Sequence, residues 1–206
     1  KVAESLLQIK AIKLQPKNPF TWASGWKSPI YCDNRVALSH PAIRTYIRQK
    51  LSQLIQEEFG SVDMISGVAT AGIPQGVLVA QDLGLPFSYV RSSAKDHGRQ
   101  YLIEGEVISG QRGVVIEDLV STGKSSLQAV KALREAGCNV VGLVSIFTYG
   151  LEVARKNFEE AKCTFHSLCN YDALIHVAAS NSYILESDIE LLEKWKIDPA
   201  NWNPES

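Results

Sequence analysis

Residues 114–126 read Val-Val-Ile-Glu-Asp-Leu-Val-Ser-Thr-Gly-Lys-Ser-Ser, and this stretch decides the fold. An apolar run ends in two acids, Glu117 and Asp118, and small hydroxyl residues around Gly123 follow them. From Ser125 onward the apolar residues recur at helical spacing. The pattern predicts a buried strand that leads through a short loop into a helix.

The same alternation extends in both directions along the chain. Strands are predicted at 62–66, 87–90 and 139–147, a hairpin at 101–116, and helices at 74–83, 125–136, 151–161 and from Pro41 to a stop at Gly60. Strands that alternate with helices pair in parallel through right-handed crossovers. We therefore predict an α/β fold in which helices flank a mostly parallel, twisted sheet.

The segment before Ser39 fits this alternation poorly and is expected to form an appended cap. We predict one domain over 1–206, with a core at about 41–170. The cap, at about 1–40, is expected to be joined by elements from the carboxy-terminal part of the chain. Ligands of such sheets bind at the carboxyl ends of the strands, which is where Glu117 and Asp118 stand.

The composition of the chain argues against some classes of binding partner. Of the 206 residues, 45% are hydrophobic and 21% charged, so the chain can bury a full core. A net charge of −1 argues against a nucleic-acid binder and against docking on an anionic membrane. No apolar run approaches the roughly 20 residues of a membrane helix. The 4 cysteines form no C-x-x-C pair, which favours a reduced, cytoplasmic protein.

The acids and the loop after them suit a phosphorylated sugar. Backbone amides at a helix amino terminus hold a phosphate dianion, and Gly123 permits close approach. Ser121, Thr122 and Ser125 add hydroxyl donors. The acids repel phosphate, but they accept hydrogen bonds from sugar hydroxyls and stabilise positive charge on a sugar ring.

Two other phosphate-binding motifs fail on this stretch. The Gly-Lys-Ser at 123–125 is similar to the end of a nucleotide-binding P-loop, but that motif requires glycine where Asp118 stands. No G-x-G-x-x-G follows any predicted strand, which excludes the dinucleotide fingerprint. A helix cap with two incidental acids is the remaining alternative.

Residues 114–126 resemble the phosphoribosyl-pyrophosphate (PRPP) signature of the type I phosphoribosyltransferases, in which a hydrophobic strand runs into Glu/Asp-Asp and a Thr-Gly phosphate loop. Three further segments are similar to the orotate-specific branch of this family. Residues 91–99, Arg-Ser-Ser-Ala-Lys-Asp-His-Gly-Arg, look like its catalytic loop; 20–33 look like its amino-terminal hood; 67–74 look like its loop beneath the pyrophosphate.

The resemblance implies a fold, a reaction and a set of roles. Orotate and PRPP give orotidine 5′-monophosphate and pyrophosphate in pyrimidine (UMP) synthesis, with Mg²⁺ bound through PRPP and no metal held by the protein alone. The family implies a cytoplasmic homodimer, in which the loop at 91–99 reaches the neighbouring site. The expected PRPP-binding residues are Arg91, Lys95, His97, Glu117, Asp118, Leu119, Val120, Ser121, Thr122, Gly123, Lys124 and Ser125. Lys95, His97 and Asp118 are the expected catalytic residues, and Ser121 also touches orotate.

The chain departs from the family's pattern at four positions. Many members carry lysines where this chain has Ser92 and Ala71, and some carry one at Ala23. Lys124 stands where a small residue is usual, and either shares the charge of the 5′-phosphate or points to solvent. These changes bear on pyrophosphate binding and leave the central motif intact.

Two other functions compete with this interpretation. A purine phosphoribosyltransferase is disfavoured by the hood-like segment and by the Lys-Asp-His-Gly run at 95–98. A PRPP-sensing regulator that binds nucleic acid should show a basic face or an added helix-turn-helix. A zinc site at Cys163, His166 and Cys169 is also disfavoured, because a strand would hold the two cysteines about 20 Å apart.

Overall fold

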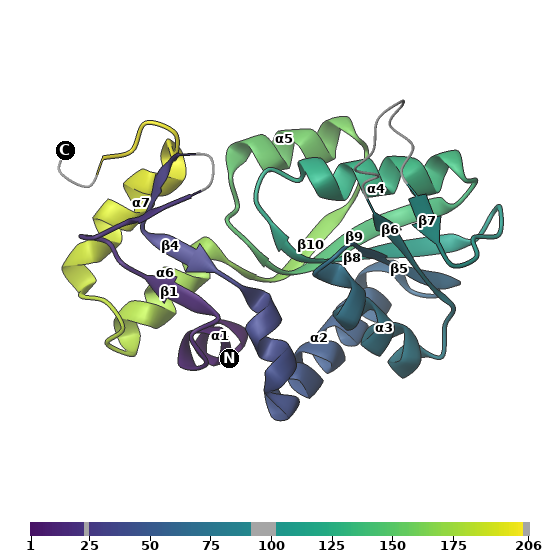
Figure 1. Cartoon of the computed structure of the whole chain (residues 1–206), viewed down its shortest axis with the longest axis horizontal. Helices are drawn as coiled ribbons and strands as arrows, with labels where there is room; N and C mark the ends of the chain where they lie inside the picture. Colours follow the sequence, from purple (N-terminus) through teal and green to yellow (C-terminus); the bar gives the residue numbers. More distant parts are fainter. Residues whose placement is uncertain (23–24, 92–101, 204–206) are drawn as a thin grey trace.

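The structure, a computed structural model, describes residues 1–22, 25–91 and 102–203. A six-stranded sheet forms its centre (Figure 1). In spatial order its strands are β10 (Phe165–Asn170), β9 (Asn139–Thr148), β8 (Arg112–Val120), β5 (Met64–Val68), β6 (Phe87–Arg91) and β7 (Leu102–Glu104). All neighbouring pairs are parallel except β6–β7. The predicted α/β class with a mostly parallel sheet is confirmed.

Helices cover both faces of this sheet (Figure 1). On one face lie α2 (Pro41–Phe59) and α3 (Gly72–Leu83), and on the other α4 (Lys124–Glu135) and α5 (Glu152–Glu160). Strand β8 serves both cores because successive side chains point to opposite faces. Ile116 packs in the cluster that includes α2 and α3, whereas Val115 packs in the cluster that includes α4 and α5.

A second layer of structure, at the left of Figure 1, lies beyond the carboxyl ends of the strands. We call residues 1–40 the hood. It contains α1 (Val2–Gln8), β1 (Ile12–Leu14), β2 (Phe20–Thr21), β3 (Lys27–Ser28), β4 (Ile30–Cys32) and the 3₁₀ helix η1 (Asn34–Ser39). The pairs β1–β4 and β2–β3 are antiparallel and separate from the main sheet.

The last part of the chain returns to the hood (Figure 1). It forms α6 (Tyr171–Ser180), η2 (Glu186–Asp188) and α7 (Ile189–Ile197). Trp195 of α7 is fully buried, and its indole Nε1 donates to the Lys27 carbonyl at 3.2 Å. Its ring meets Trp22 edge-on at 5.7 Å and Tyr149 at 5.6 Å. This aromatic cluster joins the two ends of the sequence.

Most predicted elements are found within about two residues of their expected ends, as is usual for element boundaries. The strand predicted at 62–66 is β5, at Met64–Val68, and the helix predicted at 74–83 begins earlier, at Gly72. The hairpin predicted at 101–116 is wrong. Both edges of β8 are occupied by the parallel strands β5 and β9, so β7 pairs instead with the free edge of β6.

The cysteines and histidine of the disfavoured zinc motif serve separate purposes. Cys163 and Cys169 are buried in different hydrophobic clusters, and the His166 ring faces Glu58 at 3.4 Å. No helix in the described ranges is long and apolar enough to cross a bilayer.

Candidate active site

The carboxyl end of β8 holds the two acids predicted from the sequence. Glu117 points toward α4, where its Oε2 accepts a hydrogen bond from the Ser126 hydroxyl at 3.0 Å. Only 5% of Glu117 is exposed. Burial, with the nearby charge of Asp118, raises the pKa of Glu117 to about 8. An acid in this state exchanges a proton near neutrality.

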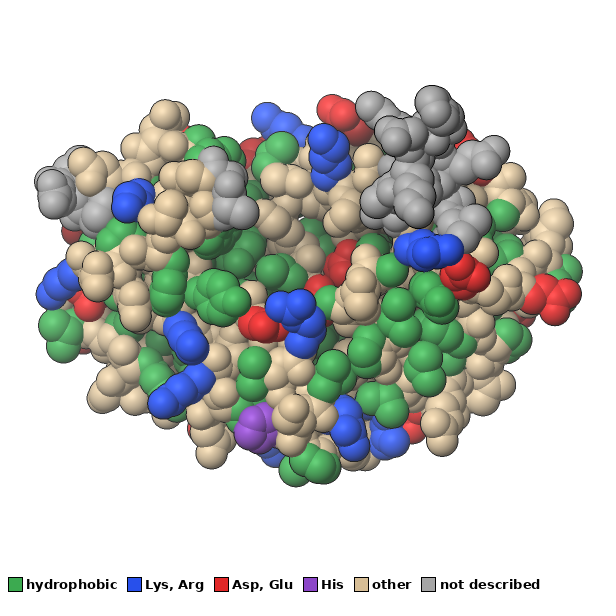
Figure 2. All heavy atoms as spheres, in the orientation of Figure 1, with side chains coloured by type: hydrophobic (Ala, Val, Ile, Leu, Met, Phe, Trp, Pro, Cys, Tyr) green, Lys and Arg blue, Asp and Glu red, His purple; other side chains and the backbone are tan. Residues whose placement is uncertain are grey.

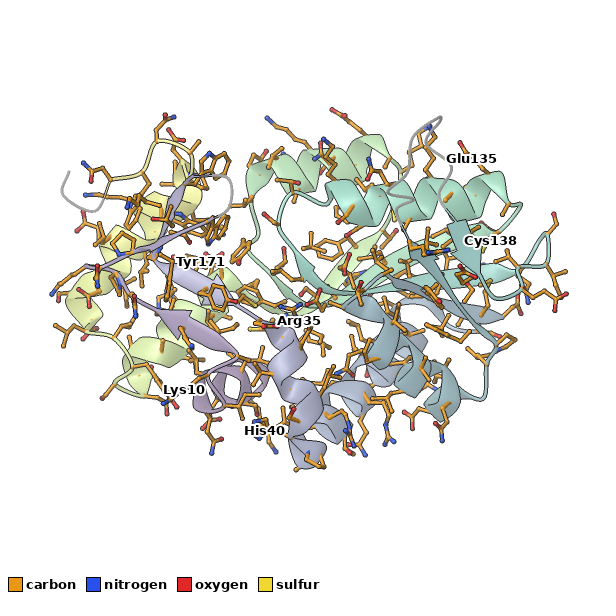
Figure 3. All side chains as sticks on the ribbon, in the orientation of Figure 1. Lys10, Arg35, His40, Glu135, Cys138 and Tyr171 are labelled. Carbon is orange, nitrogen blue, oxygen red and sulfur yellow. The ribbon has the colours of Figure 1, made fainter. Side chains whose placement is uncertain are left out.

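Asp118 follows at the end of the strand, where it is half-buried and close enough to the hood for the positive charge of Arg35 to act on it. Burial raises the pKa of Asp118, while hydrogen bonding and the positive charge of Arg35 act in the opposite direction. Figure 3 shows Arg35 between the hood strands and the main sheet. In Figure 2 acidic and basic side chains meet near the middle of this face, where the hood joins the core. The two acids are thus neighbours in sequence with different surroundings.

A direct contact ties the hood to this strand. The side chain of Asn34, which is 2% exposed, donates from Nδ2 to the backbone carbonyl of Asp118 at 2.8 Å. Its Oδ1 accepts from the Cys32 thiol at 3.4 Å. Sequence reasoning missed Asn34, because nothing local to an asparagine in a turn identifies a partner 84 residues away.

The loop after β8 has an anchored backbone and an open outer surface. The Asn157 side chain of α5 donates to the Thr122 carbonyl at 2.9 Å, and the Thr148 hydroxyl donates to the Val120 carbonyl at 3.0 Å. Gly123 has φ +76°, and a Cβ there would lie 2.6 Å from the Phe158 ring. A fixed loop that opens a helix presents free N–H groups to an anion.

The predicted residues of this loop differ in their exposure to solvent. Lys124 and Ser125 are exposed at the start of α4, and Ser121 and Thr122 are half-buried. Exposure of Lys124 is compatible with both alternatives left open by the sequence, a share in the charge of the 5′-phosphate or a side chain in solvent.

A cavity of about 390 Å³ lies between this loop and the hood. Its lining comes from three parts of the chain and is mostly aromatic or uncharged: Thr21, Trp22, Tyr31, Cys32, Leu119, Ser121 and Tyr149. The Trp22 and Tyr149 rings stack obliquely at 5.4 Å and 38°. Burial raises the pKa values of Cys32 and Tyr149 well above their ordinary ranges, so both side chains stay protonated. The volume and lining are typical of a small-molecule site.

Of these lining residues, Ser121 is the one that the sequence assigned to a base. The others stand in segments singled out by the sequence, but the packing that turns their side chains toward one cavity is tertiary. Leu119, predicted to bind PRPP, also lines this cavity.

Two more strand ends converge on the same edge of the sheet. Arg91 ends β6, and its guanidinium pairs with Glu104 of β7 at 2.9 Å. The loop after β5 leads into Gly72, whose Cα lies so close to β8 that a Cβ would be 2.5 Å from the Ile116 carbonyl oxygen. Ala71 of that loop is the amino-terminal cap of α3. The segment beneath the predicted pyrophosphate position therefore packs directly on β8.

Several predicted residues fall outside the described ranges. These are the expected catalytic residues Lys95 and His97 and the two departures Ser92 and Ala23.

Comparisons with known proteins identify the class. The family model of the phosphoribosyl transferase domain matches residues 37–176. The chain belongs to the phosphoribosyltransferase family.

Within that family, highly similar relatives share one specific name. The orotate phosphoribosyltransferase of Phocaeicola vulgatus is 58% identical over 200 residues, which are 97% of this chain and 94% of that protein. The enzyme of the same name from Listeria monocytogenes is 53% identical, over 98% of this chain and 96% of that protein. A crystal structure of orotate phosphoribosyltransferase from Aeropyrum pernix matches with a TM-score of 0.79 at 25% identity, covering 87% of this chain and 99% of that one. The chain falls among the orotate phosphoribosyltransferases.

Proposed function

We propose that this chain transfers the 5-phosphoribosyl group of PRPP to orotate, giving orotidine 5′-monophosphate and pyrophosphate. The observation that carries this proposal is the placement of a helix-opening loop and an aromatic-lined cavity side by side at one strand end. Such a reaction needs one open, polar subsite and one dry, flat subsite within bonding distance of each other.

PRPP occupies the open side. Its 5′-phosphate lies against the loop from Ser121 to Ser125, where backbone amides and hydroxyl groups meet it. Its ribose hydroxyls donate to Glu117 and Asp118. Arg91 faces the pyrophosphate from the neighbouring copy, joined there by the sequence-assigned Lys95 and His97 of the same copy.

Asp118 also acts on the reacting carbon. Ribose C1 gains positive charge as its bond to pyrophosphate weakens, before the nitrogen of the base forms its bond. A carboxylate nearby stabilises that charge. Asn34 fixes the backbone of Asp118 from the hood side, so the acid does not have to reorganise during the reaction.

A magnesium ion fits this site through its substrate. Mg²⁺ prefers oxygen ligands and keeps substrate phosphates among them. Glu117 and Asp118 supply oxygen atoms, but no group of three or more potential ligating side chains occurs among the described residues. The ion would thus be held mainly by PRPP, with these two acids near it, and it would neutralise the leaving pyrophosphate.

Orotate occupies the cavity. The Trp22 and Tyr149 rings provide a flat apolar wall for a pyrimidine ring. The hydroxyls of Ser121, Thr21 and Tyr149 are donors at its edges. This arrangement turns the edge of the base that carries the reacting nitrogen toward the phosphate loop, where C1 of the ribose lies.

The active assembly we propose is a cytoplasmic homodimer in which residues 91–99 of one copy complete the site of the other. Arg91 supports this proposal, because it stands at the open end of β6 with its side chain half exposed.

Filling the cavity tests where orotate binds. We expect Cys32→Trp to raise the KM for orotate at least about 10-fold, since the indole occupies space that the base needs. The affinity for PRPP, measured by titration calorimetry, should change little. Leu119→Trp fills the cavity from the opposite wall, and Cys32→Ala is the control that leaves it open. An unchanged KM for orotate in both filled variants, each binding PRPP normally, would exclude this cavity as the orotate site.

A further inference from the structure

The cavity lacks a charge that its proposed ligand requires. Orotate carries a carboxylate, which ionises well below neutral pH like other carboxyl groups. Among the described residues, none of the side chains that line the cavity is charged, and the thiol and phenol with raised pKa values stay neutral. A carboxylate taken out of water without a cation or several donors is strongly disfavoured. A cation must therefore reach the cavity from its rim.

Lys27 reaches that rim. In the β2–β3 pair, Thr21 stands directly opposite Lys27, and residues opposite each other in an antiparallel pair share one face. Thr21 lines the cavity, so Lys27 lies on the cavity side of the hairpin. The contact is direct, because the Lys27 ammonium donates to Thr21 Oγ1 at 3.2 Å. The other pair of this hairpin, Phe20 and Ser28, faces the opposite way.

The ammonium of Lys27 is available to an anion. It forms no ion pair with any carboxylate in the described part of the chain, and Thr21 takes one of its three donors. Its backbone is fixed, since the carbonyl of Lys27 accepts from the fully buried Trp195. A fixed, unpaired cation beside a neutral cavity is a suitable partner for the carboxylate of a base.

Arg35 is the competing cation, and its surroundings favour another role. Its guanidinium donates to both carboxylate oxygens of Asp33, at 2.7 and 3.0 Å, so its charge is already balanced. Its remaining influence acts on Asp118, at the ribose side.

We propose that Lys27 binds the carboxylate of orotate and selects orotate over uncharged pyrimidines, with Thr21 positioning its ammonium. This inference rests on the proposed function, which places orotate in the cavity. It assigns specificity for the acid to the hood.

A pair of ligands that differ only in charge tests the proposal. Orotate is the substrate, and orotamide, its neutral amide, serves as a competitive inhibitor. We expect Lys27→Met to raise the KM for orotate roughly 10- to 100-fold, the loss of one charge-assisted hydrogen bond. The inhibition constant of orotamide and the KM for PRPP should stay within about 2-fold, because neither ligand uses this charge. Lys27→Arg should recover most of the affinity, and Lys131→Met, on an exposed turn of α4, is the control for net charge.

The other outcomes are decisive. Equal weakening of orotate and orotamide in Lys27→Met would assign Lys27 a structural role and overturn the proposal. So would an unchanged KM for orotate, or a loss of selectivity in Arg35→Gln alone. The filled-cavity variants separate the two proposals. If Cys32→Trp blocks orotate while Lys27→Met keeps full selectivity, the inference about Lys27 fails and the proposed function stands.

Discussion

Glu117 and Asp118 are adjacent in sequence, yet each is held by a different part of the fold. Ser126 of α4 binds the first through its side chain, and Asn34 after the hood strands binds the second through its backbone. Burial raises the pKa of both acids, and the charge of Asp118 raises that of Glu117 further. Their position is therefore a cost to the stability of the free protein.

That cost predicts a pH dependence. The folded-state pKa of Glu117, about 8, lies above the ordinary value of 4.5. The folded chain therefore binds this proton more tightly than the unfolded chain does. This contribution to stability is complete below the ordinary value and is lost as the pH rises through about 8. We expect Glu117→Gln to abolish this loss of stability. Above about pH 8, the ligand-free variant should therefore be more stable than the wild type by about 1–3 kcal/mol.

Urea unfolding of both proteins at about pH 5 and about pH 8.5 measures the effect. Glu135→Gln, on an exposed acid at the end of α4, controls for the change in net charge. Identical pH slopes in wild type and Glu117→Gln would show that Glu117 is not the group responsible.

At the scale of elements, the turn between β8 and α4 is the most constrained piece of the site. Gly123 needs a positive φ, and its Cα faces the Phe158 ring of α5 with no room for a side chain. Phe158 in turn stacks on Phe165 of β10 at 4.5 Å. The shape of the phosphate loop therefore depends on the packing of a helix that contributes no group to the chemistry.

We expect Gly123→Ala to destabilise the protein by about 2–4 kcal/mol, the sum of backbone strain and a forced shift of Phe158. The KM for PRPP should rise with it. Gly110→Ala is the matched comparison, because Gly110 also has a positive φ, +89°, but open space around it. It should cost about 1 kcal/mol, from strain alone. Denaturant midpoints and PRPP titration measure both, and equal losses in the two variants would contradict the role given to Phe158.

The elements that could be predicted from the sequence are those whose signals are local. The strand, turn and helix over 114–126 were predicted because apolar runs, a glycine and a helical period follow one another directly. The pairing of β7 with β6 could not be predicted from the sequence, because it depends on which strand edges remain free once the parallel core has formed. The same limit hid the contact of Asn34 with Asp118 and the wall built by Trp22 and Tyr149. Each joins residues that only tertiary packing brings together.

At the scale of the whole molecule, the family domain and the hood contribute different residues to the candidate site. The shared family domain at 37–176 contains the phosphate loop and both acids, whereas Thr21, Trp22, Tyr31 and Cys32 of the cavity precede it. The proposed function thus assigns the chemistry common to the family to the sheet and selection of the base to the hood.

The proposed homodimer makes a prediction at this scale. Lys95→Ala and Asp118→Asn each remove one half of a shared site, so each pure variant should be nearly inactive. Mixed after partial unfolding, they should recover up to about a quarter of wild-type activity, since half of randomly formed dimers have one intact site. Orotate consumption, followed by its ultraviolet absorbance, measures the recovery. No recovery, with hybrid dimers shown by mass spectrometry, would contradict the shared site.

The joining of the hood to α7 has a consequence for synthesis of the chain. A ribosome releases the segment containing Glu117, Asp118 and the phosphate loop well before it adds Trp195. The hood strands, made first, must wait for that tryptophan before the carbonyl of Lys27 gains its buried partner. The nascent chain can therefore shape the loop after β8 early, but the hood strands gain their buried anchor only once Trp195 has been added.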